Sequence, residues 1–165
     1  MQLSIIIVSW NTKSFLIKCL DSILAYPPDR DYDIWVVDNA SRDGTSEHVG
    51  ESYPMLHLIE NSENMGFARG NNQAFQCSKG RYILILNPDT EVKAGLFEIL
   101  LRFMDTHLEA GAVGPLILNS DYTLQTSSVT VHLVRGLSEK MVSAGGVHPL
   151  RTPFFRVLTP FRWGN

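Results

Sequence analysis

The sequence is poor in the features that mark membrane, disulfide-bonded and metal-cluster proteins. No apolar run approaches the ~20 residues that a membrane-spanning helix needs, and no charged leader precedes the first strand-like segment. Its two cysteines, Cys19 and Cys77, both lie in predicted helices, so we expect buried free thiols in a reducing cytosol. The five histidines show no paired metal-ligand spacing. These absences favour a cytoplasmic protein of ordinary globular composition.

Glycine is missing from the turn after the first predicted strand. Residues 9–14 read Ser-Trp-Asn-Thr-Lys-Ser, whereas a dinucleotide-binding G-x-G-x-x-G loop and a Walker A loop both need glycines there. A nucleotidyltransferase would need a loop rich in glycine, arginine and lysine at this place. A phosphoacceptor receiver domain would need acidic residues instead. All four classes are therefore disfavoured.

Acidic residues become scarce towards the C-terminus. Residues 132–165 carry five Lys or Arg and one acid, Glu139, which gives +4, whereas the rest carries 9 basic and 16 acidic residues, which gives −7. The acidic body argues against nucleic-acid binding. The segment from Arg151 to Trp163 interleaves aromatic and basic residues. It suggests either peripheral contact with anionic lipid or an unfinished region whose aromatic side chains would promote homo-oligomers.

The sequence does contain a regular alternation of apolar strands and helices. Its 165 residues suffice for one domain with a real core. Because strands and helices alternate, we expect a mostly parallel α/β sheet with right-handed crossovers and helices on both faces. The predicted strands are 3–8, 34–37, 55–59, 82–86 and 112–118, and the predicted helices are 12–25, 45–51, 67–78, 95–107 and 134–143.

Helical spacing predicts which side chains face the core. In the first helix these are Phe15, Leu16, Cys19, Leu20, Ile23 and Leu24, and in the fourth they are Leu96, Ile99, Leu100 and Phe103. Asn11 or Thr12 is the expected N-cap of the first helix.

The strand over 82–86 (Tyr-Ile-Leu-Ile-Leu) organises the rest of the chain. Its aliphatic run is typical of a strand buried on both faces of a parallel sheet. Pro88 cannot donate to a sheet ladder, so the strand ends there and places Asp89 at its carboxyl end, where open α/β sheets bind ligands. A carboxylate at that edge suits Mg²⁺ or Mn²⁺. An Asp at this position could equally cap the following helix.

Two other predicted strands also end in polar groups. Ser9 and Asn11 follow the first strand, and Asp38 follows the second. If the three strands are neighbours, these groups line one crevice that suits a nucleotide, where Asp38 could bind a ribose hydroxyl or a base N–H. Trp10 could stack on a base, although a Trp at a strand end more often packs in the core. Because no glycine-rich loop is available for the diphosphate, a cation on Asp89 would neutralise it.

Residues 64–72 (Asn-Met-Gly-Phe-Ala-Arg-Gly-Asn-Asn) form a further candidate binding segment. Gly66 would let the backbone approach a ligand closely, and the helix that follows would present N–H donors. Arg69 offers a bidentate donor group for phosphate. An ordinary turn before an exposed amide face is the alternative, but amides are poor helix formers, so we favour binding.

Four motifs occur in an order that resembles family 2 glycosyltransferases. They are residues 4–11 (SIIIVSWN), 36–44 (VVDNASRDG), 64–72 (NMGFARGNN) and 86–90 (LNPDT). Each motif alone is weak, but four in this order over roughly residues 3–128 are highly specific. The Asn-Pro-Asp motif, together with a later Gly-Pro segment and Leu124-Gln125, is similar to the rhamnosyltransferase-like subset of polysaccharide assembly.

The resemblance implies a GT-A fold, which is a Rossmann-like domain for nucleotide-diphospho-sugars. It implies transfer with inversion from a UDP-, dTDP- or GDP-linked donor to a hydroxyl of a glycan or a lipid-linked acceptor. Together with the residue chemistry above, it leads us to expect donor contacts from Ser9, Trp10, Asn11, Asp38, Asn39, Gly66, Arg69, Asn72 and Asn87. Asp89 would hold Mg²⁺ or Mn²⁺ as the last carboxylate of the family's D-x-D motif. Asn87 replaces the first acid, and its neutral amide would reach the sugar or a metal-bound water instead.

The resemblance also reveals that the general base is missing. Family members carry this base in an acidic motif of the acceptor-binding half, and no such motif follows residue 121. We therefore expect a donor-binding domain over 1–130 and an incomplete acceptor region over 131–165, in a truncated or split enzyme whose catalytic base is unassigned. The alternative is a non-catalytic nucleotide-sugar-binding module. A lipid-linked acceptor would place the protein at the inner face of the membrane.

Overall fold

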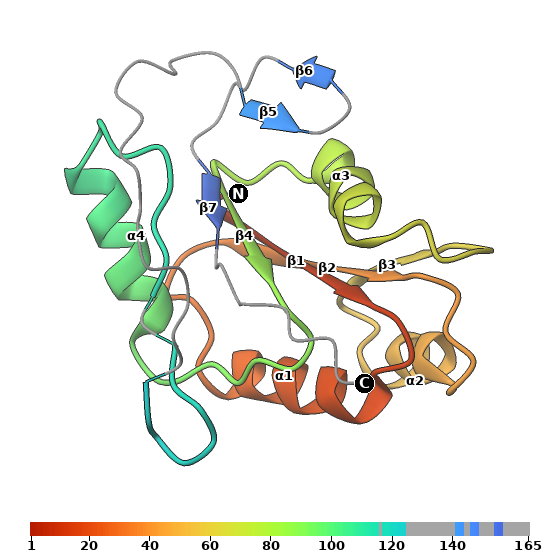
Figure 1. Ribbon diagram of the computed structural model, residues 1–165. Coiled ribbons are helices and arrows are strands. Elements are labelled where there is room, and N and C mark those ends of the chain that lie inside the picture. Colours follow the sequence, from red (N-terminus) through yellow and green to blue (C-terminus); the bar gives the residue numbers. More distant parts are fainter. Residues whose placement is uncertain (116, 125–140, 144–145, 149–153, 157–165) are drawn as a thin grey trace.

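The computed structural model describes residues 1–115, 117–124, 141–143, 146–148 and 154–156 (Figure 1). The strands are β1 (Leu3–Ser9), β2 (Tyr32–Asp38), β3 (His57–Glu60), β4 (Tyr82–Leu86), β5 (Met141–Ser143), β6 (Gly146–His148) and β7 (Phe154–Arg156). The helices are α1 (Lys13–Ala25), α2 (Thr45–Ser52), α3 (Phe67–Cys77) and α4 (Leu96–Thr106).

Five of the strands form a parallel sheet in the order β3-β2-β1-β4-β7. The predicted mostly parallel sheet is therefore confirmed. β5 and β6 form a separate antiparallel pair. The chain first proceeds from β1 through β2 to β3 and then returns to place β4 on the other side of β1. The strand order therefore reverses between β1 and β4, and open α/β sheets bind their ligands beside such a reversal.

Helices cover both faces of the sheet, as predicted (Figure 1). Side chains of α1, α2 and α4 share one hydrophobic core with Leu3, Ile5 and Ile7 of β1. Side chains of α3 share a second core with Ile6 and Val8 on the opposite face. Because successive side chains of a strand point to opposite faces, β1 needs apolar residues at nearly every position.

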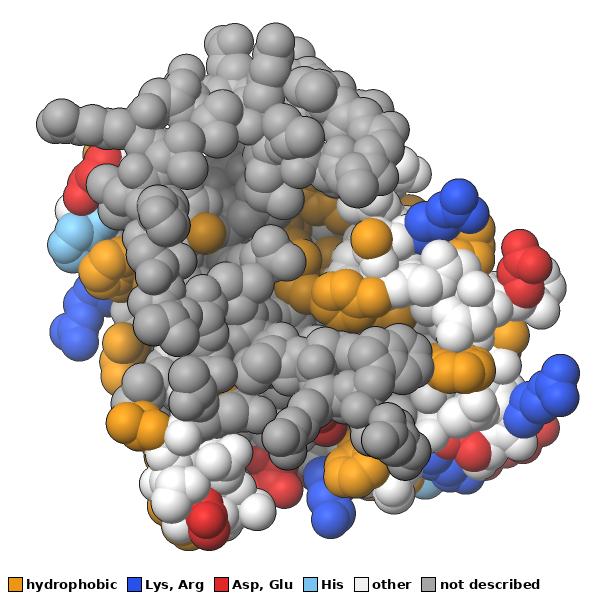
Figure 2. Space-filling view, viewed as in Figure 1, with side chains coloured by type: hydrophobic (Ala, Val, Ile, Leu, Met, Phe, Trp, Pro, Cys, Tyr) orange, Lys and Arg blue, Asp and Glu red, His pale blue; other side chains and the backbone are white. Residues whose placement is uncertain are grey.

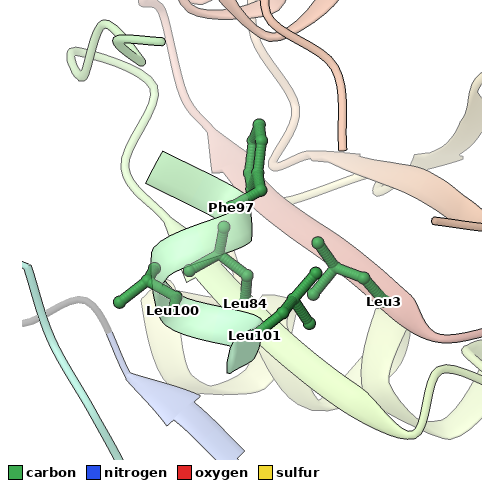
Figure 3. A pocket seen from close by; sticks show the side chains of 5 residues that line it. All are labelled: Leu3, Leu84, Phe97, Leu100 and Leu101. Atoms are coloured by element: carbon green, nitrogen blue, oxygen red, sulfur yellow. The ribbon is translucent and has the colours of Figure 1, made fainter. Parts of the chain in front are cut away.

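α4 packs across the first core with an entirely apolar contact. Phe97, Leu100 and Leu101 of α4 face Leu3 of β1 and Leu84 of β4 (Figure 3). The small gap between these five side chains has no polar lining. It is a feature of core packing rather than a binding site, because ligand sites need a few convergent polar groups.

The predicted inward faces of two helices were partly wrong. Phe15 and Leu24 of α1 are 53% and 37% exposed, whereas the other four predicted core residues of that helix are buried. In α4, Ile99 and Phe103 are exposed, and the buried residues are Phe97, Leu100, Leu101 and Met104. Apolar side chains lie almost all round α4, so their spacing alone did not identify the buried face. Cys19 is buried as expected, but Cys77 is exposed.

The predicted strand over 112–118 was also wrong. Only Leu118 in that segment forms a bridge, to Leu124, and no strand forms among its described residues. Pro115 interrupts the segment and lacks the N–H that a ladder needs. Most of the predicted helix over 134–143 lies outside the described residues, and its end, Met141–Ser143, is strand β5. The predicted domain boundary at residue 130 and most of the segment from Arg151 to Trp163 also lie outside the described residues.

Candidate functional site

Three neighbouring strands bring the predicted site residues to one edge of the sheet. Ser9 pairs in register with Asp38, and Leu86, which precedes Asn87, pairs with Ile7. The prediction that these strands are neighbours is therefore confirmed. Parallel strands lie about 4.8 Å apart, so the ends of β2 and β4 are separated by about 10 Å, with the end of β1 between them. That spacing is the right scale for one nucleotide site.

The first turn is bonded internally rather than open. Ser9 is fully buried, and its hydroxyl hydrogen-bonds to the hydroxyl of Thr12 at 2.8 Å. Trp10, in contrast, is 47% exposed, so its ring remains accessible for stacking on a ligand. The side chain of Ser9 therefore shapes the turn, while Trp10 is the residue of this turn that a base could contact.

Asn11 joins the first turn to the loop after β2. Its backbone N–H donates to Ser41 Oγ at 2.8 Å, and its Oδ1 accepts from the Arg42 N–H at 2.8 Å. Asn11 and Ala40 both have positive φ, 52° and 61°. Such conformations are costly outside glycine and concentrate at binding sites. The two loops therefore form one preorganised unit.

Asp38 is buried, and its carboxylate holds the same loop. The residue is 3% exposed. Oδ2 accepts from Ser46 Oγ at 2.6 Å and from the Ser41 N–H at 3.3 Å, and Oδ1 accepts from Ser41 Oγ. A carboxylate has about four acceptor positions, so these donors leave room for one more. Asp38 thus shapes the loop through Ser41 and Ser46 and retains limited capacity for a ligand.

Asn39 connects the end of β2 with the start of α3. Its Nδ2 donates to the carbonyl oxygen of Gly66 at 3.3 Å, and its Oδ1 accepts from Asn61 Nδ2 at 2.8 Å. Asn61 follows β3 and forms two hydrogen bonds of 2.8 Å with the side-chain amide of Gln73 in α3. Asn39 is 2% exposed, and its amide is a buried structural link between these elements.

The start of α3 presents both exposed and buried polar side chains. Arg69 and Asn72, two of the predicted donor contacts, are exposed. Asn71 is 6% exposed, and its Nδ2 donates to the carbonyl oxygen of Phe67 at 2.8 Å. Within the described residues Asn71 Oδ1 has no hydrogen-bond partner. A buried acceptor of this kind is costly without a partner, and a ligand or water hydroxyl could supply one.

The end of β4 carries an exposed carboxylate above a buried thiol. Asn87 is half-buried and Asp89 is exposed. Burial, together with the smaller effect of the negative charges of Asp89 and Glu91, raises the pKa of Cys19 to about 12. The Cys19 Sγ donates to the Asn87 carbonyl oxygen at 3.8 Å. The thiol therefore stays protonated, and Cys19 supports the Asn87–Asp89 corner by packing rather than as a nucleophile.

The side chains at this corner fit a cation that is shared with a ligand. No group of three or more His, Cys, Asp or Glu side chains suited to a metal occurs in the part of the chain that the structure describes. Mg²⁺ and similar cations often bind through one or two carboxylates, and substrate phosphates and water complete their coordination. Asp89 supplies one exposed carboxylate, so a divalent cation fits here when a diphosphate provides the remaining oxygen ligands.

A hollow of about 400 Å³ lies beside the joined loops, at the start of α1. It is lined by Asn11, Thr12, Lys13, Ser14, Phe15, Ile17 and Asp43. In the view of Figure 2, charged side chains of both signs lie around the rim of the molecule.

Several residues of this site were not predicted from the sequence. They are Ser41, Asp43, Ser46, Asn61 and Gln73. Ser41, Asp43 and Ser46 belong to or follow the Asn-Ala-Ser-Arg-Asp-Gly turn, so a search for carboxylates with nearby hydroxyl donors could have found them. Asn61 and Gln73 are single amides without a sequence signal.

The chain matches Glycosyl transferase family 2 over residues 4–159, and it belongs to that family. It is 26% identical, over 165 aligned residues, to the N-acetylglucosaminyl-diphospho-decaprenol L-rhamnosyltransferase of Mycobacterium tuberculosis. That alignment covers 93% of this chain and 50% of the relative. The poly(ribitol-phosphate) beta-glucosyltransferase of Bacillus spizizenii is 32% identical over 108 residues, which cover 62% of this chain and 17% of that protein.

Two solved structures share the fold. S. aureus TarS 1–349, in complex with UDP, has a TM-score of 0.66 at 20% identity. The match covers 77% of this chain and 39% of the TarS chain. The mannosyltransferase PcManGT from Pyrobaculum calidifontis, in complex with GDP-Man and Mn²⁺, has a TM-score of 0.60 at 26% identity. The match covers 70% of this chain and 36% of the mannosyltransferase chain. The predicted GT-A fold is therefore confirmed.

The chain spans half or less of the length of these relatives. Within the described residues, none of the helices combines the length and the apolar character that crossing a membrane requires.

Proposed function

We propose that this chain forms the donor-binding part of an inverting glycosyltransferase, which transfers a sugar from a nucleotide-diphosphate donor to an acceptor hydroxyl. The observation that carries the proposal is the arrival of Asp38 and Asn87 at one edge of the sheet, on the strands that flank β1. Family membership supports the same reaction class, because relatives of this chain are named as sugar transferases.

The nucleoside would bind over the loops after β1 and β2. Trp10 offers an exposed ring for the base, and the buried Asp38 keeps one acceptor position for a base N–H or a ribose hydroxyl. Asn11 and Asn39 would act on the donor mainly by fixing these loops. UDP-, dTDP- and GDP-linked sugars are the candidate donors. Structural neighbours solved with UDP and with GDP-Man support this class of ligand.

The diphosphate would lie between the end of β4 and the start of α3. Arg69 and Asn72 are exposed on the first turns of α3, where cationic and amide donors suit phosphate oxygens. Asp89 would hold a divalent cation, Mg²⁺ or Mn²⁺, and Asn87 would reach the sugar or a metal-bound water. When bound, such a cation stabilises the negative charge that develops on the leaving nucleoside diphosphate.

The acceptor would be a glycan or a lipid-linked saccharide of cell-surface polysaccharide assembly, handled in the cytoplasm at the inner face of the membrane. A relative named for a diphospho-decaprenol substrate supports this acceptor class. A carboxylate base would remove the proton from the attacking hydroxyl, and its position in this chain is unassigned.

A non-catalytic or split-enzyme donor-binding module is the second candidate. No residue of this chain is assigned as the general base, so donor binding without turnover is the alternative outcome to test. Transfer or donor-hydrolysis assays beside calorimetric binding separate the two candidates. Binding without turnover supports the module, and turnover supports the enzyme.

The proposal is tested by thermal shift with UDP, dTDP, GDP and their sugar derivatives, each with and without MnCl₂. A ligand of the native state raises the melting temperature by mass action. We expect at least one nucleotide to do so, and we expect Asp89→Ala to abolish the Mn²⁺-dependent part of the shift. Asp38→Ala should reduce the nucleotide shift whether Mn²⁺ is present or absent. If no nucleotide shifts the parent protein, or if both variants respond like the parent, the proposed site is wrong.

A further inference from the structure

Three side-chain amides, those of Asn39, Asn61 and Gln73, form a hydrogen-bonded network behind the proposed donor site, and a fourth, that of Asn64, bonds to the backbone of Gly66. Asn39 follows β2, Asn61 follows β3, Asn64 lies in the loop before α3, and Gln73 lies within α3. Asn61 Nδ2 donates to Asn39 Oδ1 and to Gln73 Oε1, each at 2.8 Å. Gln73 Nε2 donates to Asn61 Oδ1 at 2.8 Å and to the sulfur of Met65 at 3.5 Å. The network therefore spans two strand ends, a loop and a helix.

The orientation of each amide in this network follows from one backbone carbonyl. The Gly66 carbonyl oxygen can only accept, so Asn39 must turn its Nδ2 towards it, at 3.3 Å. Asn39 Oδ1 then faces Asn61, which must present Nδ2 and therefore turns its Oδ1 towards Gln73. Both amide hydrogens of Asn61 and both of Gln73 have acceptors. Turning over any one of these three amides would bring two oxygens or two N–H groups together, so the chain has a single low-energy arrangement.

The network holds a backbone conformation that is specific to glycine. Gly66 has φ 80° and ψ 167°, a region that is essentially closed to other residues. Its N–H donates to Asn64 Oδ1 at 2.9 Å, and its carbonyl oxygen accepts from both Asn39 and the Gly70 N–H. The peptide groups on both sides of Gly66 are thus fixed, and so is the residue at which α3 begins.

α3 also lies unusually close to the sheet at this end. A Cβ added to Gly70 would lie 3.0 Å from Val8 Cγ1 and 3.5 Å from Asn39 Nδ2. The first turns of α3 therefore rest directly on the end of β1 and on the amide network. A small shift of the network would move Arg69 and Asn72, which lie on these turns, relative to the ends of β1 and β2.

The geometry points to Asn61 and Gln73 as positioning residues for the nucleotide donor, acting through Asn39 and Gly66 to fix the start of α3. This inference rests on the proposed function, because Asn39, Gly66, Arg69 and Asn72 belong to the proposed donor site. Asn61 and Gln73 would not touch the donor themselves. Their contribution is preorganisation, which raises affinity by removing the cost of ordering the site on binding.

Gln73→Glu tests the inference with a nearly isosteric change. The introduced carboxylate cannot donate to Asn61 Oδ1, and the oxygens then repel each other. We expect the dissociation constant for UDP, GDP or dTDP with MnCl₂, whichever binds the parent best, to rise about tenfold, the effect of one lost half-buried hydrogen bond of ~1.4 kcal/mol. The measurement is calorimetry at a temperature where circular dichroism shows both proteins fully folded.

Protonation of the introduced carboxylate should restore nucleotide affinity in Gln73→Glu. A neutral carboxyl group can donate through its O–H, so the affinity gap between variant and parent should shrink as the pH is lowered from about 8 to about 5, since burial near oxygen acceptors raises the pKa of an introduced carboxyl. Gln76→Glu is the matched control, because it adds the same charge on an exposed position of α3. Its affinity should stay within about twofold of the parent, as for surface changes in general.

The outcomes separate this inference from the proposed function. If the parent binds none of the nucleotides, the proposed function is wrong and this inference is wrong with it. If the parent binds but folded Gln73→Glu binds equally well at both pH values, only the positioning role is overturned. Should Gln73→Glu fail to fold, Gln73→Met removes the donors without repulsion and should weaken binding about threefold. An unchanged affinity in that variant also overturns the inference.

Discussion

The carboxylate of Asp43 accepts a hydrogen bond at 2.9 Å from the backbone N–H of Lys13, the first residue of α1. Thr12 occupies the N-cap position but makes no side-chain cap, since its hydroxyl bonds to Ser9. The other oxygen of Asp43 accepts from the N–H and the hydroxyl of Thr45 at 3.2 and 2.6 Å. One carboxylate from the loop after β2 therefore caps α1 and fixes the start of α2.

We expect Asp43→Ala to lower the free energy of unfolding by about 1–2 kcal/mol, the usual cost of losing a helix cap. Burial raises the pKa of Asp43, but the hydrogen bonds from Thr45 and Lys13 outweigh it and hold the pKa below its ordinary value. A lowered native pKa gives stability that is complete above the unfolded value of about 3.9 and is lost as the pH falls through the native value.

The parent should therefore lose stability more steeply than Asp43→Asn as the pH falls from about 5 to about 3, because the amide does not titrate. Urea unfolding at several pH values measures this difference. Glu51→Gln, at an exposed position of α2, is the control and should follow the parent. If the free energy of unfolding falls equally with pH in the parent and in Asp43→Asn, the charge of Asp43 contributes nothing to the cap.

A second carboxylate, Asp105 of α4, joins three elements at the opposite edge of the sheet. It accepts from the Tyr82 hydroxyl at 2.6 Å, from Arg30 Nη1 at 2.6 Å and from Arg81 Nη1 at 3.1 Å. The bonds from Tyr82 and Arg30 hold the pKa of Asp105 below its ordinary value. Asp105→Ala should cost about 2 kcal/mol of stability, because it leaves charged and hydroxyl donors without this acceptor.

We expect the loss of the Asp105 carboxylate to affect stability but not nucleotide binding. Because β4 separates Asp105 from the carboxyl edge, Asp105→Ala should leave nucleotide affinity within about twofold of the parent, as expected for sites that share no partners. Urea unfolding and calorimetry check the two parts separately. A weakened affinity in the folded variant would mean that the two edges of the sheet are coupled.

Two glycines should respond in opposite directions to substitution by alanine. A Cβ at Gly80 would lie 2.5 Å from the Ser4 backbone nitrogen and 2.6 Å from the Tyr82 carbonyl oxygen, so the backbone would have to move. Gly80→Ala should destabilise the protein by about 2–3 kcal/mol. Gly50 lies within α2 with nothing within 4 Å of its added Cβ. Gly50→Ala should be neutral or gain up to about 1 kcal/mol, as measured by thermal unfolding.

The sequence predicted the parts of this fold that depend on composition alone. The strands β1 and β4 are mostly aliphatic because both sheet faces are covered, and Pro88 marks the end of β4. Consecutive apolar strands with helical crossovers leave few topologies, so the convergence of Ser9, Asp38 and Asn87 at one edge could be predicted.

The sequence could not predict which polar side chains bond to one another. Asp43 caps a helix that begins 30 residues earlier, and Asn61 pairs with Gln73 across a loop. Such pairs depend on the exact placement of two elements, and amide or carboxylate identity contains no information about the partner. For the same reason the sequence could not show that the hydroxyl of Ser9 bonds to that of Thr12.

The Asn87-Pro88-Asp89 corner gives the last prediction. Asn87 stands where the resemblance to the family leads us to expect an acid, and its half-buried amide is neutral. Asn87→Asp would add a second carboxylate two residues from Asp89. Hard divalent cations prefer charged oxygen ligands, so we expect the variant to bind Mn²⁺ about tenfold more tightly in the presence of nucleotide, a gain of ~1.4 kcal/mol.

The same substitution should weaken binding when metal is absent, because a new negative charge then faces the diphosphate without a cation between them. Calorimetry of the parent and of Asn87→Asp, with nucleotide in MnCl₂ or in EDTA, measures both effects. Gln76→Glu on the exposed side of α3 adds an equal charge and should change neither affinity. If affinity rises in MnCl₂ and falls in EDTA, the cation lies between the diphosphate on one side and the side chains of residues 87 and 89 on the other. Equal affinities for the parent and the variant in both conditions would exclude a metal at this corner.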